Sequence, residues 1–484
     1  MAAQPPPVTA APSVLGTGTL VRYAVGSIGT GGFSTLPGLV LVYFLTDTLG
    51  VAAIAAGLLV TLAKVWDVII DPFIGAQSDR SLARTGSRRR FMLLGAILLP
   101  LFFVITFAVP AGLSPLLSGV WVFVAFVLAA TAFSLFQVPY IALPAELASG
   151  YDARTRLLSA RVVVLTFAIL LFGAGGPALR SLGGDDEHLG YLLMGVVAAV
   201  VLFAGLIVSM TAAGKGEPFE EARASVAETY RRGWRALRRS APFRALLGTF
   251  VLQALATGMM LAGAQYVARW VLHDENAVDL LFVALIAPAL VCAPLWGVIA
   301  RRTGKERAFA FASALFGLAA LSLVVLAFAP GAWLYASVAV AGAAYAGLQT
   351  LPLAMLPDVI GHDARRHGEN RAGTFGGVWT AGETAGLALG TTVLTIVLAV
   401  TGYQASVAGE HTTQSGTAVL GIVLSFSIVP AVIVALSLLT LARYPLRRAD
   451  VEADSDAPDA DSDLPDAEAA GAVDGTPLET GPLA

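Results

Sequence analysis

A long apolar run meets a set of charged side chains in the stretch Ala63-Lys64-Val-Trp66-Asp67-Val-Ile-Ile70-Asp71-Pro72-Phe-Ile-Gly75. Residues 48–63, directly before Lys64, carry no charge. Steps of three and four residues place Lys64, Asp67 and Asp71 on one stripe of a helix. A charged side chain at mid-membrane costs at least about 2.5–3.5 kcal/mol. If this helix crosses a membrane, these charged side chains therefore need either oppositely charged or polar partners or a functional role.

The composition of the whole chain identifies it as a polytopic membrane protein. Of its 484 residues, 57% are hydrophobic and 13% are charged, against about 25% charged in an average soluble domain. Mean hydropathy is +0.77. Apolar runs of about 20 residues recur, each long enough to cross roughly 30 Å of hydrocarbon. These properties exclude soluble enzymes, nucleic-acid-binding proteins and secreted scaffolds.

The apolar runs predict an all-α membrane protein with twelve spans and both termini in the cytoplasm. Basic residues concentrate in alternate loops, at residues 80–90, 154–156, 231–239, 301–307, 365–371 and 443–448. By the positive-inside rule these loops face the cytoplasm of a cell whose plasma membrane holds the protein. The expected spans are residues 20–45, 52–76, 91–110, 116–143, 159–179, 190–212, 243–270, 279–300, 308–329, 333–356, 373–400 and 417–442.

An internal repeat predicts two pseudo-symmetric six-helix bundles, residues 20–212 and 243–442. The segment Gly75-Ala-Gln-Ser-Asp79-Arg80 after the second span matches Gly297-Val-Ile-Ala-Arg301-Arg302 after the eighth. Pro139-Tyr-Ile-Ala-Leu-Pro144 likewise matches Pro352-Leu-Ala-Met-Leu-Pro357 at the ends of spans 4 and 10. Such a duplication is typical of secondary transporters that open a central site to alternate sides of the membrane.

Three segments lie outside the two bundles. We expect residues 1–19 to be disordered, with no signal peptide. Residues 213–242 alternate apolar and charged positions at helical spacing, which predicts an amphipathic linker helix on the cytoplasmic membrane surface. Residues 443–484 are strongly acidic, and we expect a disordered cytoplasmic tail.

The charged stripe of the second span suits ion coupling. Two carboxylates one turn apart on an apolar helix form an oxygen site for a small cation, or a pair whose repulsion favours binding of a proton. We therefore predict that Asp67 and Asp71 bind the coupling ion and that Lys64 is their counter-ion. An ion-pair cluster that only holds helices together is the alternative.

Other polar side chains within the spans have a structural and a functional interpretation. Arg161, at the start of span 5, is either a second counter-ion for the stripe or a positive-inside anchor. Glu383, among small residues of span 11, is either a contact of the central cavity or a partner in interhelical hydrogen bonding. Trp66 belongs to an aromatic belt or lines a cavity beside Asp67.

The sequence shows no pattern for an enzyme, a metal site or a nucleotide site. The five histidines fall in loops without metal-ligand spacing, and Cys292 is the single cysteine. There is no P-loop, so ATP is not the expected energy source. We expect no cofactor, and we expect a Na⁺ or H⁺ gradient to drive the protein.

The sequence resembles the glycoside–pentoside–hexuronide:cation symporters, the melibiose-carrier branch of the major facilitator superfamily. The resemblance implies the major facilitator fold, a sugar or glycoside substrate, and a cation site at Asp67 and Asp71. It lies in the span 2 run, Asp79-Arg80, Arg84-Thr-Gly86-Ser-Arg88-Arg89, Tyr43-Phe-Leu-Thr46-Asp47, Pro139-Tyr140, Arg154-Thr-Arg156-Leu, Pro357-Asp358 and Gly368-Glu-Asn-Arg371.

The departures from the family's pattern concern both the ion and the sugar. Ile70 stands where the sodium-coupled carriers have an Asn, which favours protons over sodium, although Ser134 supplies the family's nearby hydroxyl. The carboxylates that contact galactosides fall at Gly31 and Gln137, and a frequent Lys of span 11 falls at Thr384. The sugar-recognition part of the family's pattern is largely missing.

We predict a secondary active transporter that couples symport of a small organic solute to a cation or proton. The candidate cavity contacts are Trp66, Gln137, Tyr140, Trp379, Glu383 and Thr384, and the candidate cytoplasmic gate is Gly75, Asp79, Arg80 and Arg88. A proton-driven exporter of an apolar or lysolipid-like compound and a non-transporting membrane sensor are the alternatives. The expected partners are the solute and the lipid bilayer, with no nucleic acid, and we expect a monomer.

Overall fold

The structure is a computed structural model that describes residues 16–147, 151–214, 231, 235, 237–274, 277–367, 372–408 and 412–446. The chain divides into two units, Met1–Pro445 and Leu446–Ala484. Apart from Leu446, the described residues lie in the first unit. The expected linker helix lies mostly outside the described residues, and so do the N-terminal segment up to residue 15 and the acidic tail.

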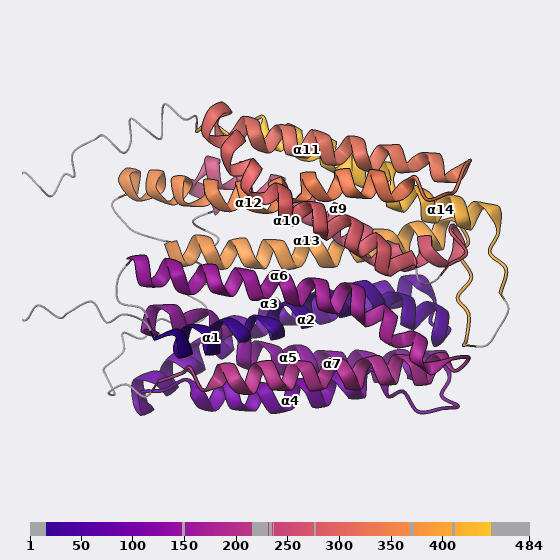
Figure 1. Cartoon of the computed structure of the whole chain (residues 1–484), viewed down its shortest axis with the longest axis horizontal. Helices are drawn as coiled ribbons and strands as arrows, with labels where there is room; N and C mark the ends of the chain where they lie inside the picture. Colours follow the sequence, from indigo (N-terminus) through magenta and orange to yellow (C-terminus); the bar gives the residue numbers. More distant parts are fainter. Residues whose placement is uncertain are drawn as a thin grey trace, which may run out of the picture. The chain divides into compact units, whose positions relative to one another are not determined.

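The first unit is a bundle of long helices (Figure 1). Twelve helices, or groups of consecutive helices, in the described part of the chain are long and apolar enough to cross a membrane, which confirms the predicted number of spans. The first half contains α1 (Thr17–Val25), α2 (Ser27–Tyr43), the π-helix η1 (Phe44–Thr48), α3 (Ala53–Thr85), α4 (Arg89–Phe107), α5 (Pro115–Leu147), α6 (Tyr151–Arg180), the short η2 (Ser181–Gly183) and α7 (Glu187–Met210). The second half contains α9 (Ala241–Trp270), α10 (Ala277–Thr303), α11 (Lys305–Ser322), η3 (Leu323–Ala327), α12 (Leu334–His367), α13 (Ala372–Val400), α14 (Gly416–Phe426) and α15 (Ile428–Leu441).

Several helices continue well beyond the apolar runs that predicted them. The second span was expected to end at residue 76, but α3 continues to Thr85. The tenth was expected to end at 356, but α12 continues to His367. An apolar run marks the part of a helix that lies in hydrocarbon, whereas a helix itself ends where the backbone turns. Gly86 provides that turn for α3, because its φ of 67° is left-handed.

The two halves pack against each other through the helix pairs α2–α9, α3–α13 and α6–α10. On α3 and α13 the contact runs antiparallel: Gly57 faces Thr395, and the Thr61 hydroxyl donates to the Ala388 carbonyl oxygen at 3.3 Å. A side-chain hydrogen bond also joins Thr61 to Thr392. A Cβ atom at Gly57 would overlap Thr395, so the glycine is required for this close approach.

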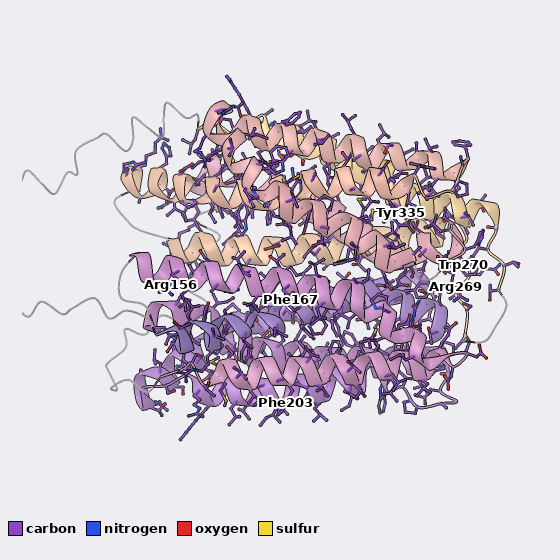
Figure 2. The ribbon with its side chains drawn as sticks, viewed as in Figure 1. Arg156, Phe167, Phe203, Arg269, Trp270 and Tyr335 are labelled. Atoms are coloured by element: carbon purple, nitrogen blue, oxygen red, sulfur yellow. The ribbon has the colours of Figure 1, made fainter. Side chains whose placement is uncertain are left out.

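The bundle has two ends, which we call the Asp47 end and the Arg88 end. Helices α2, α9 and α13 finish at the Asp47 end, and α3 and α10 finish at the Arg88 end, next to the start of α4 and α11. Figure 2 shows Arg269 and Trp270, the last residues of α9, at the opposite end of the bundle from Arg156, near the start of α6. The contacts between α3 and α13 at Gly57 and Thr61 lie in the part of the bundle nearer to the Asp47 end.

Candidate functional site

The charged stripe on α3 lies on the interior side of the first half. Lys64 Nζ donates to Asp67 Oδ2 at 3.2 Å, and Asp67 is buried. The Lys64 ammonium also lies over the rings of Phe33 and Phe126, 5.4 and 5.6 Å from their centres. The ion pair and the two rings together compensate for burying the ammonium group.

Both carboxylates of the stripe have spare acceptor capacity. Within the described part of the chain, Asp67 Oδ1 and Asp71 Oδ1 are buried and accept no hydrogen bond. Buried Ser134 of α5 is a hydrogen-bonding neighbour of Asp71, and the charges of Asp67 and Lys64 also act on Asp71. Two unpartnered carboxylate oxygens beside a hydroxyl form a place where a small cation or a proton is favourably bound.

Trp66 does not share the interior face with its neighbour Asp67. Its side chain is 39% exposed, in a row with the exposed apolar side chains of Leu62, Ile69 and Phe73. The indole N–H donates to Thr131 Oγ1 of α5 at 2.8 Å. The structure thus places Trp66 on an outward apolar surface and not beside Asp67 in the interior.

A second polar group of the first half joins α1, α2, α5 and α6. Gln137 Oε1 accepts from the Thr30 hydroxyl at 2.8 Å, and the Tyr140 hydroxyl donates to the Tyr23 carbonyl oxygen at 3.0 Å. Arg161 lies over the Tyr140 ring, 5.5 Å from its centre. Among the described residues, the interactions of Arg161 are with Tyr23 and Tyr140, not with Asp67 or Asp71.

The second half contributes a separate polar region around α13. Trp379 is buried and stacks on Phe250 of α9 with ring centres 4.3 Å apart. Its indole N–H has no acceptor among the described residues. Glu383 is half-buried and acts electrostatically on Tyr345 of α12. Thr384 lies one turn before Ala388, on the stripe of α13 that faces α3.

The predicted gate residues at the Arg88 end form contacts within their own half. Arg88 is buried, forms an ion pair with Asp79, and donates to Ser78 Oγ at 2.8 Å. Gly75 packs near Val138 of α5, and Arg80 is exposed. These contacts link α3 to its neighbours α4 and α5.

The second half has a matching ion pair at the same end. Lys305 Nζ, at the start of α11, donates to Asp358 Oδ2 of α12 at 2.6 Å and to the Ala354 carbonyl oxygen at 3.0 Å. This pair also lies within one half. The ion pairs described at the Arg88 end therefore brace each half separately.

At the Asp47 end, by contrast, hydrogen bonds cross between the halves. Asp47 is 1% exposed, and its Oδ1 accepts from the Tyr403 hydroxyl at 2.5 Å and from the Trp270 indole at 3.3 Å. Its Oδ2 accepts from the Thr46 hydroxyl at 2.6 Å, and that hydroxyl is also bonded to Tyr266 at 2.7 Å. We call Thr46, Asp47, Tyr266, Trp270 and Tyr403 the Asp47 cluster.

Backbone hydrogen bonds extend this contact along the loop after α13. The Ser406 N–H donates to the Thr46 carbonyl oxygen at 2.9 Å, and the Ala408 N–H to that of Thr48 at 3.0 Å. Leu49 and Val407 form an antiparallel β-bridge. The π-helical turn η1 presents these carbonyl groups to the second half. The two halves are thus joined by main chain as well as by side chains.

Charged side chains surround the cluster at the same end. Arg269 pairs with Glu187 at 3.4 Å, and Thr48 donates to the other oxygen of Glu187 at 3.3 Å. Arg180 donates to Gln265 Oε1 of α9 at 3.3 Å and to the Tyr191 hydroxyl at 2.9 Å. Both arginines therefore connect residues of different halves.

Our reasoning from the sequence did not predict the Asp47 cluster. Its members come from three distant parts of the chain, and no sequence spacing relates Asp47 to Trp270 or Tyr403. The available signal was a carboxylate at the end of an apolar span, together with Arg180, which breaks the alternation of basic loops. Such charges at a span end require partners.

Comparison with known proteins agrees with this architecture. A family model described as MFS/sugar transport protein matches residues 22–448. The glucuronide carrier protein homolog of Escherichia coli (strain K12) is 24% identical, over 88% of this chain and 92% of its own. The sodium-dependent lysophosphatidylcholine symporter 1 of Mus musculus is 23% identical, over 70% of this chain and 69% of its own. The solved structure of a D-xylose–proton symporter matches with a TM-score of 0.63 at 13% identity, over 89% of this chain and 98% of that one.

Two halves of long membrane-crossing helices have the major facilitator fold, and the family model identifies the chain as a transporter of that superfamily. Within that superfamily, the chain belongs to the family of glycoside–pentoside–hexuronide:cation symporters. It is therefore a multi-pass plasma-membrane protein whose substrate is a small molecule.

Proposed function

We propose that the protein couples the symport of a small organic solute to a cation bound at Asp67 and Asp71. The observation that carries this proposal is the pair of buried Oδ1 atoms on α3, each without a partner among the described residues. Leaving a buried acceptor unpaired costs about 1–3 kcal/mol, and more for a charged group. A bound ion would remove that cost.

The donor set favours a proton over Na⁺ as this ion. Na⁺ requires a nearly complete shell of oxygen ligands, whereas the stripe offers two free carboxylate oxygens and the Ser134 hydroxyl. Ile70 adds no oxygen ligand, and the Lys64 ammonium lies 3.2 Å from Asp67 Oδ2. A proton needs a single oxygen and tolerates the neighbouring ammonium.

A glycoside-like solute is the substrate class that the family membership supports. The polar side chains that we propose as solute contacts are Gln137 and Tyr140 in the first half and Glu383 and Trp379 in the second; Glu383 is half-buried and the other three are buried. A lysolipid is a second candidate, favoured by the mouse relative, whose name states that it transports lysophosphatidylcholine.

We further propose that the Asp47 end faces the outside of the cell and the Arg88 end the cytoplasm. The concentration of arginines around Arg88 supports this orientation by the positive-inside rule. In this orientation the structure is closed toward the outside, because the bonds that join the halves among the described residues lie at the Asp47 end or in the part of the bundle nearer to it.

Purified protein in liposomes that contain a pH-sensitive dye tests the coupling. A pH change in the lumen is measured after addition of methyl-β-D-glucuronide, methyl-β-D-xyloside or lysophosphatidylcholine, with and without a Na⁺ gradient. We expect one of these solutes to drive proton entry without Na⁺. In Asp71→Asn we expect the rate to fall by about 100-fold or more, the scale of losing an essential ion-binding group.

Asp185→Asn is the matched control, because Asp185 is an exposed loop carboxylate outside the spans. It should transport at the wild-type rate. Proton entry at the wild-type rate in Asp71→Asn would refute the role of Asp71, and a strict need for Na⁺ would refute proton coupling alone. No ion flux with any solute, together with a stably co-purifying partner, would instead support a non-transporting sensor.

A further inference from the structure

Asp47 is a buried carboxylate held by neutral donors. Its three hydrogen bonds come from two hydroxyls, of Thr46 and Tyr403, and one indole N–H, of Trp270. Two of these donors belong to the second half. A carboxylate accepts such bonds more strongly when it is ionised than when it is protonated. The strength of the contact between the halves therefore depends on whether Asp47 carries a proton.

The tyrosine donors of the cluster keep their own protons. Burial and the neighbouring Asp47 carboxylate raise the pKa of the Tyr403 hydroxyl well above its usual range. Tyr403 therefore remains a donor at any physiological pH. Tyr266 is fully buried and hydrogen-bonded to the Thr46 hydroxyl, which itself donates a hydrogen bond to Asp47. The carboxyl group is the member of the cluster that can change charge.

Two arginines near the cluster have partners of their own, and Asp279 at the start of α10 interacts electrostatically with one of them, Arg180. Arg269 acts on Asp47 electrostatically but forms its ion pair with Glu187 of α7. Arg180 of α6 bonds Tyr191 and Gln265, and lies over the Tyr43 ring. Two histidines also lie at this end among the described residues: His188 follows Glu187 in the chain, and His273 follows α9.

We propose that Asp47 is a second proton-binding site of this protein, distinct from Asp67 and Asp71, whose occupation releases the two halves from each other at the Asp47 end. A protonated Asp47 loses one acceptor oxygen and gains an O–H that itself needs an acceptor. Tyr403 then loses its charged acceptor. The Trp270 indole loses its longer bond, of 3.3 Å, and keeps the Tyr403 hydroxyl as its acceptor at 2.8 Å. The contact between the halves weakens. A proton from the solution at this end therefore favours opening toward that same solution.

In this proposal, opening at the Asp47 end follows protonation of Asp47 and does not require that Asp71 binds the coupling ion. The cluster lies at the end of the span, whereas Asp71 lies about five turns along α3 from its start at Ala53. When the hydrogen bonds of the cluster break, the halves separate between the Asp47 end and the charged stripe of α3. The site is thus defined by where the halves meet, and it can be tested without a transported solute.

The distance between two spin labels at the Asp47 end measures the opening directly. Leu116 at the start of α5 and Val400 at the end of α13 are 77% and 81% exposed, so labels there disturb little. Cysteines at these positions, with Cys292→Ala, His188→Gln and His273→Gln, give a background without these two imidazoles at this end. Electron–electron distances are recorded in nanodiscs at about pH 7.5 and about pH 5.

We expect a longer-distance population that grows as the pH falls, by up to about tenfold per pH unit for one linked proton. Asp47→Asn should show this population at both pH values, because an amide is a weaker acceptor than a carboxylate. Tyr403→Phe should raise the population at about pH 7.5 but leave it pH-dependent, because Asp47 remains.

Two controls separate Asp47 from other carboxylates. Asp71→Asn and Glu187→Gln should both retain the response to pH. The proposal is overturned if the wild-type distances do not change with pH, if folded Asp47→Asn keeps the wild-type response, or if Asp71→Asn abolishes it. Thermal unfolding and size-exclusion chromatography establish that each variant is folded.

Discussion

At the scale of single residues, the ion pair on α3 shows how a membrane helix holds a buried charge. Lys64 is 25% exposed and Asp67 10% at the side chain, and they lie 3.2 Å apart. The ammonium group satisfies Asp67 Oδ2 and leaves Oδ1 free. The pair therefore stabilises the carboxylate without occupying the position that we assign to the coupling ion.

Replacement of Lys64 by Met should destabilise the protein. Met has a similar length and no charge, so the variant leaves Asp67 buried without its ion pair, at a cost of about 1–3 kcal/mol. Thermal unfolding in detergent measures the effect. The double variant Lys64→Met with Asp67→Asn should recover part of the loss, because it removes both charges. An unchanged unfolding temperature in Lys64→Met would show that the pair has no structural role.

At the scale of helices, glycines determine which elements pack closely. Gly382, Gly386 and Gly390 lie along the face of α13 that packs on α9, and a Cβ at Gly386 would lie 2.7 Å from the Val251 carbonyl oxygen. These contacts lie within the second half. Gly57 performs the same role between the halves, where α3 meets Thr395 of α13. Close packing without a side chain is common between membrane helices.

Gly57→Ala should therefore shift the balance between conformations more than it lowers stability. The added methyl group overlaps Thr395 only while the halves are closed at the Asp47 end. Spin labels at positions 116 and 400 should show more of the longer distance at about pH 7.5.

Two further variants identify the cause of that shift. Thr395→Ala should partly reverse it, because the nearest overlapping atom is removed. Gly248→Ala on α9, where a Cβ would contact nothing within 4 Å, is the control and should leave the distances unchanged. An unchanged distance distribution in Gly57→Ala would show that this contact does not limit the closure.

The sequence predicted helices and a charged stripe, but not the contacts between distant helices. Span number, and the face shared by Lys64, Asp67 and Asp71, follow from hydropathy and the helical period, which are local properties. The separation of Trp66 from that face follows from the same period, but only the structure shows that its side points outward. The Asp47 cluster depends on how η1, α9 and the loop after α13 meet, and local patterns contain no information about that meeting.

At the scale of the whole molecule, the two ends of the bundle differ in what their polar contacts join. The ion pairs of Arg88 with Asp79 and of Lys305 with Asp358 lie within single halves. The bonds of Asp47, Arg180 and Arg269 join one half to the other. A transporter that rocks its halves needs bonds between them that break and re-form. Among the described residues, the bonds of Asp47, Arg180 and Arg269 join the halves in this way, and they lie at the Asp47 end.

Removal of the chain from Leu446 onward should leave the helical unit intact. Residues Met1–Pro445 form one compact unit by themselves. We expect the unfolding temperature of the truncated protein to stay within about 2 °C of the full-length value, which is less than about 1 kcal/mol. Thermal unfolding of both purified proteins is the measurement. A drop of more than about 10 °C would show that the acidic segment supports the bundle.

The β-bridge at Leu49 and Val407 has a consequence for how the loop after α13 can diverge. The Ser406 and Ala408 N–H groups make the bonds, and every amino acid except proline supplies such a group. The side chain of Ala408 can therefore vary through evolution without loss of the closure, whereas the buried Ser406 hydroxyl also donates to the Asp47 carbonyl oxygen at 3.3 Å. In related transporters that keep this β-bridge, we expect the amino acids at these positions to vary within these limits, but we expect no proline.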